Sequence, residues 1–140
     1  MEKLKPRATV KTSPEQFSGD VWMDPIYFGE EPSRLRAALV RFSPCARTDW
    51  HSHPKGQTLH IVSGVALIGA RDGTIIEARA GETVWTPPGE EHWHGAAPDR
   101  FMAHLALWEA AGDGRPDADW LDKVTDEVYN GPRIRADAKD

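Results

Sequence analysis

The chain is poor in cysteine, in positive charge and in long apolar runs. Cys45 is the only cysteine among 140 residues, so no disulfide can form within the chain and nothing indicates an oxidising compartment. The formal net charge of −5 offers no basic surplus to attract nucleic acid or an anionic membrane. The polar N-terminus lacks the apolar core of a signal peptide, and no stretch approaches the length of a transmembrane helix. We therefore expect a cytoplasmic protein that binds neither nucleic acid nor membranes.

A chain of this length holds one domain with one core. Short apolar runs separated by turn residues are typical of an all-β sandwich or barrel, and we expect that architecture over residues 21–112. Residues 1–20 predict an extended N-terminal arm. Residues 113–140 predict a C-terminal helix and tail, with the helix over 118–130, where apolar residues recur at helical spacing. The expected strands cover residues 34–42, 57–63, 65–70, 74–78, 83–86, 92–96 and 101–108.

Four of the six histidines form two His-x-His pairs, His51 with His53 and His92 with His94. On a β-strand this spacing turns both rings of a pair to one face, so each pair can converge on a single point. Gln57 follows His53 by four residues and opens the next apolar run, which places a carboxamide oxygen beside two imidazoles. The pattern predicts one divalent metal ion held by His51, His53, Gln57 and His92. The alternative for an isolated pair is two polar residues on a solvated face.

The remaining histidines have different expected roles. His94 shares a face with His92 but is an additional imidazole beyond the ligand set, and a nearby cation would keep it neutral and available as a general base. The alternative is a hydrogen-bonded core histidine. His104 either contacts His94 or fills the barrel, whereas His60 has the opposite parity to Gln57 and should point away from the cavity. Trp22, Trp50, Trp85 and Trp120 are interpreted as packing residues rather than as a stacking platform for bases.

The spacing of these residues resembles the two sequence motifs of the cupin superfamily. The first motif combines His-x-His with a glutamate and a glycine, and the second combines a glycine, Pro-x-Gly and a histidine. The corresponding residues here are His51, His53, Gln57 and Gly64, then Gly81, Pro87, Gly89 and His92. The resemblance implies a small cupin barrel, a jelly-roll-like double-stranded β-helix of two antiparallel sheets, with both motifs lining one cavity.

Three departures from the cupin pattern carry information. Cys45 stands where the first glycine is expected, so that turn must tolerate a side chain, and Ala96 replaces an asparagine of the second motif. Gln57 replaces the glutamate ligand. Three imidazoles and a carboxamide leave a divalent ion its full charge, whereas a carboxylate would neutralise about half of it, so this centre would hold anions more tightly and resist oxidation. The alternative is that metal binding has been lost and Gln57 is an ordinary barrel residue.

Longer stretches resemble the bacterial monocupins described as carboxymuconolactone-decarboxylase-associated, a group that includes manganese-dependent hydroxynitrile lyases. The matching stretches are residues 46–54 (ARTDWHSHP), 56–59 (GQTL), 81–85 (GETVW) and 88–98 (PGEEHWHGAAP). The resemblance implies metal ligation by His51, His53, Gln57 and His92 and a base role for His94.

The same resemblance assigns residues to the substrate pocket. Ala38 and Val40 match small residues that line it, and Thr48 matches a residue near the substrate, although strict strand alternation would turn Thr48 away from His51. Trp108 stands where the lyases carry a glutamine, and its larger side chain would reshape the pocket. The candidate catalytic residues are therefore His94, His104 and Thr48, and the candidate pocket residues are Ala38, Val40 and Trp108.

Together with these residues, the resemblance implies a metal-dependent lyase that acts on small carbonyl-derived substrates such as cyanohydrins. The alternatives are a metal-dependent oxygenase of cupin type and a non-catalytic accessory cupin that holds a metal and a small ligand. Nitrogen and carboxamide ligands suit manganese, iron or nickel, with manganese favoured by the resemblance and zinc also compatible. By family analogy, we expect a homodimer or homotetramer whose partner is a small-molecule substrate.

Overall fold

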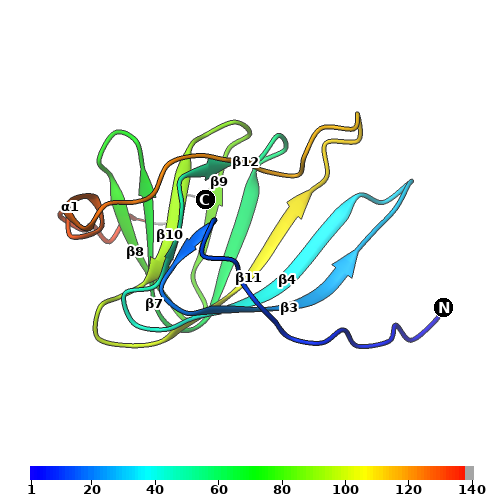
Figure 1. The fold of residues 1–140 in the computed structure, drawn as a ribbon, viewed down its shortest axis with the longest axis horizontal. Coiled ribbons are helices and arrows are strands. Elements are labelled where there is room, and N and C mark those ends of the chain that lie inside the picture. Colours follow the sequence, from blue (N-terminus) through cyan, green and yellow to red (C-terminus); the bar gives the residue numbers. More distant parts are fainter. Residues whose placement is uncertain (138–140) are drawn as a thin grey trace.

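The computed structural model describes residues 1–137, and this part of the chain contains twelve strands and one short helix (Figure 1). The strands are β1 (Val10–Lys11), β2 (Phe17–Ser18), β3 (Val21–Phe28), β4 (Leu35–Phe42), β5 (Arg47–Thr48), β6 (His51–Ser52), β7 (Gln57–Ala70), β8 (Ile75–Arg79), β9 (Thr83–Thr86), β10 (His92–Ala96), β11 (Met102–Glu109) and β12 (Asp119–Trp120). The helix is α1 (Asp126–Tyr129). The predicted all-β architecture is confirmed. Within residues 1–137, no helix is long and apolar enough to cross a membrane.

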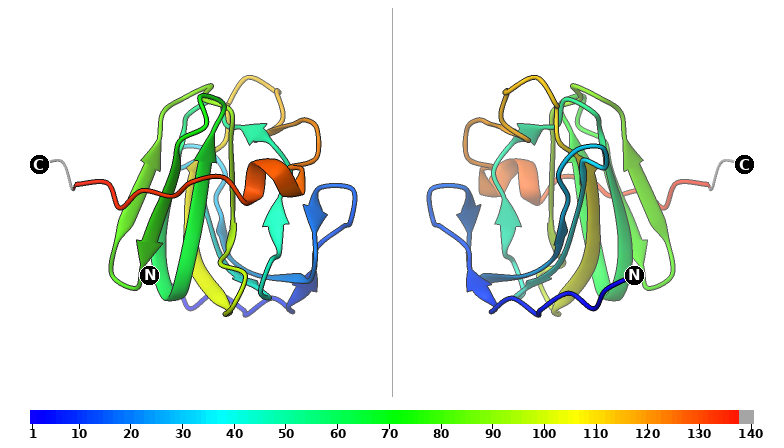
Figure 2. Two further views of the ribbon diagram at one scale, coloured as in Figure 1. Left: turned by 90° about the vertical axis from the view of Figure 1, so that its left-hand side faces the viewer. Right: turned by 90° about the vertical axis from the view of Figure 1, so that its right-hand side faces the viewer.

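The strands form two antiparallel layers that curl over one another (Figures 1 and 2). One layer has the order β1-β3-β4-β11-β7-β9, and the other has the order β2-β5-β10-β7-β8, with β6 pairing to β10 and β12. Strand β7 belongs to both layers, because its first residues pair with β9 and its last residues pair with β8. The two layers therefore share one long strand and enclose a single interior.

Strand β7 runs through 14 residues, so the prediction of two separate strands over 57–63 and 65–70 was wrong. The register against β11 shifts between Ala103 and His104, which marks a β-bulge. Gly64 has a φ of +75°, and a Cβ at this position would collide with the carbonyl oxygen of Phe101. Only glycine fits such a close approach at positive φ. Gly64 therefore marks the bend where the strand passes between layers, and it does not end the strand.

The inward faces follow the predicted alternation. Gln57, Leu59 and Ile61 of β7 are all buried, as their shared parity requires. His60 lies on the opposite face, half-buried, with its Nδ1 atom 2.9 Å from the Thr83 hydroxyl. The prediction that His60 points away from the cavity is confirmed. The core between the layers also contains Val21, Ala38, Val40, Phe42, Ala46, Ala66, Ile68, Ala78, Ala96, Met102 and Ala106.

The C-terminal helix is much shorter than predicted, since α1 spans Asp126–Tyr129 and not 118–130. Trp120 lies in β12, which pairs with β6, and the Leu121 N–H donates to the Trp50 carbonyl at 2.8 Å. Thr125 caps α1 by accepting a hydrogen bond from the Val128 N–H. Backbone groups that pair with a neighbouring strand cannot also form a helical ladder. Tertiary pairing therefore overrides the apolar periodicity over 118–124.

The C-terminal segment covers the outer face of the second layer. The Tyr129 hydroxyl donates to the Ala96 carbonyl at 2.6 Å, and its ring lies 5.8 Å from that of Trp93. The Arg47 guanidinium lies 4.6 Å from the centre of the Tyr129 ring. A second apolar cluster forms here from Trp50, Leu67, Ile75, Trp93, Val124 and Tyr129.

The predicted N-terminal arm pairs with strands of its own chain. Strand β1 pairs with β3, and β2 pairs with β5. The residues before β1 run along the outside of the molecule toward the N-terminus (Figure 1). The arm therefore lies against the barrel of its own chain, and Phe17 lines the same cavity as the histidines.

Two local expectations meet different outcomes. Cys45 has a φ of +69°, so the turn keeps the left-handed backbone that glycine usually occupies, and the exposed thiol side chain is tolerated there. Trp85, interpreted as a packing residue, is 60% exposed on the outer side of β9, so that interpretation was wrong. The alternation of β9 turns its neighbours Val84 and Thr86 inward and leaves the indole outside.

Candidate metal centre and substrate cavity

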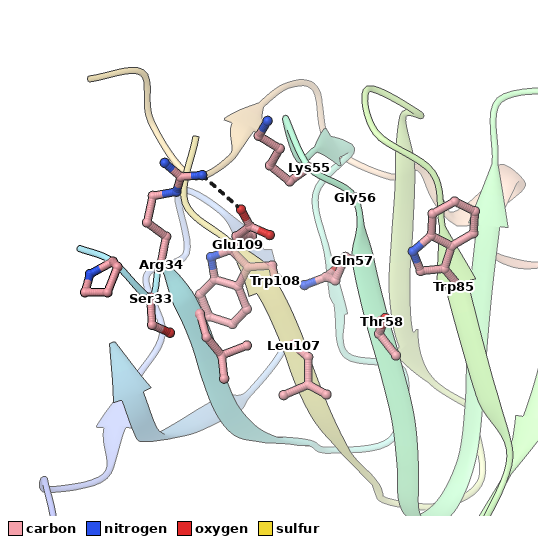
Figure 3. A pocket seen from close by; sticks show the side chains of 12 residues that line it. Ser33, Arg34, Lys55, Gly56, Gln57, Thr58, Trp85, Leu107, Trp108 and Glu109 are labelled. Atoms are coloured by element: carbon pink, nitrogen blue, oxygen red, sulfur yellow. Dashed lines mark hydrogen bonds and ion pairs between the residues drawn. The ribbon is translucent and has the colours of Figure 1, made fainter. Parts of the chain in front are cut away.

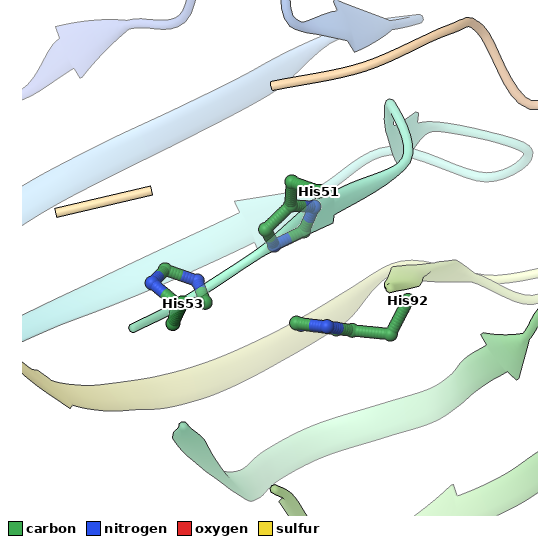
Figure 4. A group of neighbouring side chains, drawn as sticks. All are labelled: His51, His53 and His92. Atoms are coloured by element: carbon green, nitrogen blue, oxygen red, sulfur yellow. The ribbon is translucent and has the colours of Figure 1, made fainter. Parts of the chain in front are cut away.

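Three of the predicted ligands gather at one point in the interior. One ring nitrogen from each of His51, His53 and His92 lies within 4.8 Å of the other two (Figure 4). All three side chains are buried. His51 of β6 is paired directly with His92 of β10, and His53 follows in the turn after β6. The pairing of two His-x-His strands therefore converts sequence spacing into a triad.

The outer nitrogen of each ring is held by the main chain. The Nδ1 atoms lie 2.9 Å from the Asp49 carbonyl for His51, 2.9 Å from the Asp117 carbonyl for His53 and 3.0 Å from the Glu90 carbonyl for His92. Because a carbonyl can only accept, each Nδ1 carries the proton and each Nε2 keeps its lone pair. The Nε2 atom of His53 is buried without a hydrogen-bond partner in the described chain. This is the donor arrangement of metal-ligating histidines.

Gln57 completes the set from the start of β7. Its side chain is buried, and its Oε1 atom lies 3.0 Å from the Nε2 atom of His92. Burial is the largest cause that lowers the pKa of all three histidines, to about 4 for His92, and the neighbouring rings add to it at His51. Neutral imidazoles and a carboxamide oxygen therefore face one another, and these donors fit a divalent cation.

His94 and His104 form a second buried pair behind the triad. The Nε2 atom of His104 lies 2.8 Å from the Nδ1 atom of His94. Of the two roles considered for His104, contact with His94 or filling of the barrel, the structure shows the contact. Burial, followed by the neighbouring His104, lowers the pKa of His94 well below 6.5, and burial lowers that of His104 to about 4. The Nε2 atom of His94 has no hydrogen-bond partner within residues 1–137. Both rings are therefore neutral near pH 7.

Thr48 lies at the cavity, against the expectation from strict alternation. Residues 47–48 form β5 and residues 51–52 form β6, and the bend at Asp49 and Trp50 between the two strands breaks the alternation. The Thr48 hydroxyl accepts a hydrogen bond from the His94 N–H at 3.1 Å. The expectation that Thr48 turns away was wrong, because residues 47–52 are not one continuous strand.

A cavity of about 660 Å³ lies beside the histidines. All three predicted pocket residues, Ala38, Val40 and Trp108, line it. One wall carries Thr48, His51, His53, Gln57, His94 and His104. The apolar lining also contains Phe17, Met23, Ala106 and Trp120. The cavity is therefore largely apolar, with polar groups on the side of the histidines and at residues 11–13, Gln16 and Asp117.

Sequence reasoning missed two residues at this centre. The Trp120 ring stacks on His51, with a centroid separation of 4.6 Å and an interplanar angle of 26°. Asp117 accepts from the His53 Nδ1–H through its carbonyl and from the Trp108 indole N–H through its carboxylate. The interpretation of 118–130 as a helix concealed the role of Trp120, and no local pattern marks Asp117.

A second pocket, of about 400 Å³, adjoins the first at the end of the barrel. Gln57 and Trp108 line both pockets. Figure 3 shows them among the side chains of the second pocket. Arg34 and Glu109 form an ion pair of 3.3 Å at the rim. The outer pocket is polar and open, which distinguishes it from the apolar inner cavity.

Comparison with known proteins gives consistent results. The sequence model described as a cupin domain matches residues 38–108. The chain is 41% identical over 129 residues to a protein of Granulicella tundricola named (R)-mandelonitrile lyase, covering 92% of this chain and 97% of that protein.

Two solved structures have similar folds. A cupin-like protein from Thermotoga maritima has a TM-score of 0.80 and 34% identity, covering 92% of this chain and 95% of its own. A polyketide cyclase from Streptomyces resistomycificus has a TM-score of 0.68 at 18% identity, covering 92% and 90%, which shows a likeness of fold alone. The family-model match ends at Trp108, so Asp117 and Trp120 lie outside it.

Proposed function

The chain belongs to the cupin family, and on that premise we propose that it is a metal-dependent lyase that cleaves cyanohydrins into a carbonyl compound and cyanide. The observation that carries the proposal is a buried neutral histidine, His94, with an unpartnered Nε2 in the described chain, beside four residues suited to a divalent ion. The relative named (R)-mandelonitrile lyase supports the same chemistry.

Three histidines and one glutamine would hold the ion. These residues are His51, His53, His92 and Gln57, which would bind through three Nε2 atoms and one Oε1 atom. When bound, a divalent ion supplies a Lewis acid that lowers the pKa of a hydroxyl group. We assign manganese first, and iron, nickel or zinc would fit the same donors. The neutral carboxamide of Gln57 favours a lyase over an oxygenase, because it leaves more positive charge at the centre and makes oxidation harder.

His94 would act as the proton acceptor, with His104 positioning it. The two rings share one hydrogen bond of 2.8 Å, so one nitrogen donates and the other accepts. When His94 Nδ1 donates to His104 Nε2, the lone pair of His94 is on Nε2, the atom without a protein partner. A proton acceptor at a reacting hydroxyl needs this tautomer.

The proposed cleavage moves one proton and breaks one carbon–carbon bond. His94 Nε2 takes the hydroxyl proton, the oxygen electron pair forms the carbonyl double bond, and the electrons of the breaking bond leave with cyanide. Cyanide then takes the proton from His94 and departs as hydrogen cyanide. The Thr48 hydroxyl, held against the His94 N–H, positions this strand at the cavity.

The cavity walls favour substrates with an apolar side chain. Ala38 and Val40 of β4 leave room beside the proposed ligands, whereas Trp108 of the neighbouring strand β11 occupies volume in the same layer. A volume of about 660 Å³ accommodates a small organic molecule. Trp108 stands where the lyases carry a glutamine, so we expect a preference among cyanohydrins that differs from theirs.

The direct test is release of benzaldehyde from mandelonitrile by protein reloaded with manganese. His94→Ala should reduce release by 100-fold or more, about the contribution of a general base, while the metal content stays at the wild-type value. His60→Ala is the matched control, because His60 points outward. Release by the loaded wild type no faster than by the metal-free protein would exclude the proposal.

The two alternative functions predict other results in the same preparation. An oxygenase loaded with iron would consume oxygen with an enolic or phenolic substrate. An accessory module would bind the ligand without turnover, and His94→Ala would then change only ligand affinity. The predicted cytoplasmic location and the homodimer or homotetramer stay predictions.

A further inference from the structure

We propose that Asp117 is a positioning residue that orients a metal ligand and fixes the cavity wall at the same time. Its main-chain carbonyl holds His53, and its carboxylate holds Trp108. The inference depends on the proposed metal site and adds a residue from outside the cupin-domain match.

The first contact determines the orientation of His53. The Asp117 carbonyl accepts from the His53 Nδ1–H at 2.9 Å across 64 residues of sequence. His53 Nε2 has no hydrogen-bond partner in the described chain, so this contact alone sets the tautomer of the ring. Hydrogen bonds of this kind fix the direction of the ligand lone pair. The position of Asp117 therefore controls where His53 points.

The second contact determines the orientation of Trp108. The Asp117 Oδ2 atom accepts from the Trp108 Nε1–H at 3.3 Å and from the Arg36 Nε–H at 2.9 Å. The Trp108 ring also packs edge-on against Phe28, with centroids 5.8 Å apart. An indole held by a hydrogen bond on one side and by an aromatic edge on the other has little freedom to rotate. The carboxylate thus fixes the shape of the wall that Trp108 forms.

The two contacts are coupled because they belong to one residue. The His53 and Trp108 rings are neighbours, with centroids 6.1 Å apart. A shift of Asp117 would therefore move a metal ligand and the substrate wall together. The part-buried ion pair between Asp117 and Arg36 is a further contact of the same carboxylate. By itself it would not explain why the His53 and Trp108 rings both bond to Asp117.

Removal of the carboxylate tests the coupling. Asp117→Ala removes the carboxylate that holds the segment to Arg36 and Trp108, so the main-chain carbonyl that orients His53 is held less firmly. The affinity of the metal-free protein for Mn²⁺ should fall about 10-fold, the low end for loss of an outer partner of a ligand. The KM ratio between a bulky and a small cyanohydrin should also change, as should the near-ultraviolet circular dichroism of the tryptophans. Asp117→Asn keeps an acceptor oxygen for the indole and should recover most of the wild-type values.

Asp113→Ala is the matched control. Asp113 lies in the same segment and forms an exposed ion pair with Arg115 at 2.7 Å. This variant should bind Mn²⁺ as the wild type does. If Asp117→Ala and Asp113→Ala give equal Mn²⁺ affinity, equal KM ratios and equal spectra, the proposal is wrong.

A second variant keeps the test decisive if Asp117→Ala does not fold. Trp108→Phe removes the indole N–H and keeps an aromatic wall, so it should change the KM ratio and leave Mn²⁺ affinity within about 3-fold of wild type, because the contact to His53 remains. An unchanged KM ratio in Trp108→Phe would contradict the wall contact. Absence of cyanohydrin cleavage by wild type would refute the proposed function, whereas the Mn²⁺ comparison would still test Asp117.

Discussion

Two regions of the chain contribute to the same centre: the strands that carry the histidines, and the C-terminal segment, residues 113–129. They differ in how well their role can be predicted from the sequence. His51 and His53 occur at a recognisable His-x-His spacing, and the pairing of β6 with β10 brings them to His92. Asp117 and Trp120 reach the same rings by a hydrogen bond and by stacking. Their own neighbourhood in the sequence predicted a helix and tail.

The difference arises because ligands and the residues that support them are constrained in different ways. Ligand atoms must converge, so their spacing is constrained and can be recognised. The residues that support the ligands need only be brought nearby by tertiary pairing, here through β12 on β6, and any local pattern is compatible with that role. Residues that support the proposed metal centre are therefore harder to recognise in the sequence than the proposed ligands.

The largest effect is expected from the histidine strands. His53→Ala removes a proposed ligand, and it should lower Mn²⁺ affinity by about 100-fold or more, because loss of a ligand exceeds the roughly 10- to 100-fold effect of outer partners. Titration of the metal-free protein against a chelator of known affinity measures this. His60→Ala, with an outward ring, should bind as the wild type does. Equal affinity of the two variants would remove His53 from the ligand set.

The C-terminal segment should show a smaller but measurable effect. Trp120→Ala removes the ring stacked on His51 and the contact with Phe17 at 5.6 Å. We expect about 10-fold weaker Mn²⁺ binding and a loss of about 2 kcal/mol in the free energy of unfolding for a partly buried aromatic. Chelator competition and urea unfolding measure the two quantities. Trp85→Ala is the control, because that indole is 60% exposed, and indistinguishable variants would show that the segment does not support the centre.

Gln57→Glu tests the electrostatic distinction within the ligand set. A carboxylate should strengthen Mn²⁺ binding by charge and weaken retention of anions, since the centre loses about one unit of positive charge. We expect cyanide or azide to inhibit the variant about 10-fold less strongly than the wild type, which corresponds to about 1.4 kcal/mol. Inhibition constants with both anions provide the measurement. Stronger anion inhibition in Gln57→Glu would contradict the role assigned to the carboxamide.

The smallest effect concerns the anchor of the C-terminal segment. Tyr129→Phe removes the hydroxyl that donates to the Ala96 carbonyl at 2.6 Å. The free energy of unfolding should fall by about 1 kcal/mol, with Mn²⁺ affinity nearly unchanged. Urea denaturation compares this variant with Tyr27→Phe, in which the changed residue is a half-buried tyrosine of β3. A loss in Tyr129→Phe no larger than in Tyr27→Phe would show that this hydrogen bond does not anchor the segment.

Much of the fold could be predicted because apolar and polar residues alternate along the strands and glycines mark the turns. Strands β9 and β10 begin and end where the sequence predicted, and the shared face of Gln57, Leu59 and Ile61 is buried. The continuity of β7 was missed, because a glycine within a bulge has the same sequence signal as a glycine in a turn. The prediction of a long C-terminal helix was wrong because β12 forms its backbone hydrogen bonds with β6.

For the candidate site, the sequence predicts which residues face the interior better than it predicts their contacts. Ala38, Val40 and Trp108 all line the cavity beside the histidines, and their contact with a substrate stays a prediction. Thr48 was misjudged because a bend between β5 and β6 breaks the alternation, which residue types alone do not reveal. The contact between His104 and His94 stayed open in the sequence, since parity places both rings inside without fixing the distance between them.

The central claim is that one divalent ion binds to His51, His53, Gln57 and His92. Elemental analysis of protein purified without a nickel column and reloaded with manganese tests it most directly. The expected result is one Mn²⁺ per chain, lost in His53→Ala and retained in His60→Ala and His94→Ala. A reloaded wild type with no stoichiometric metal, or a His53→Ala variant with the full amount, would contradict the claim.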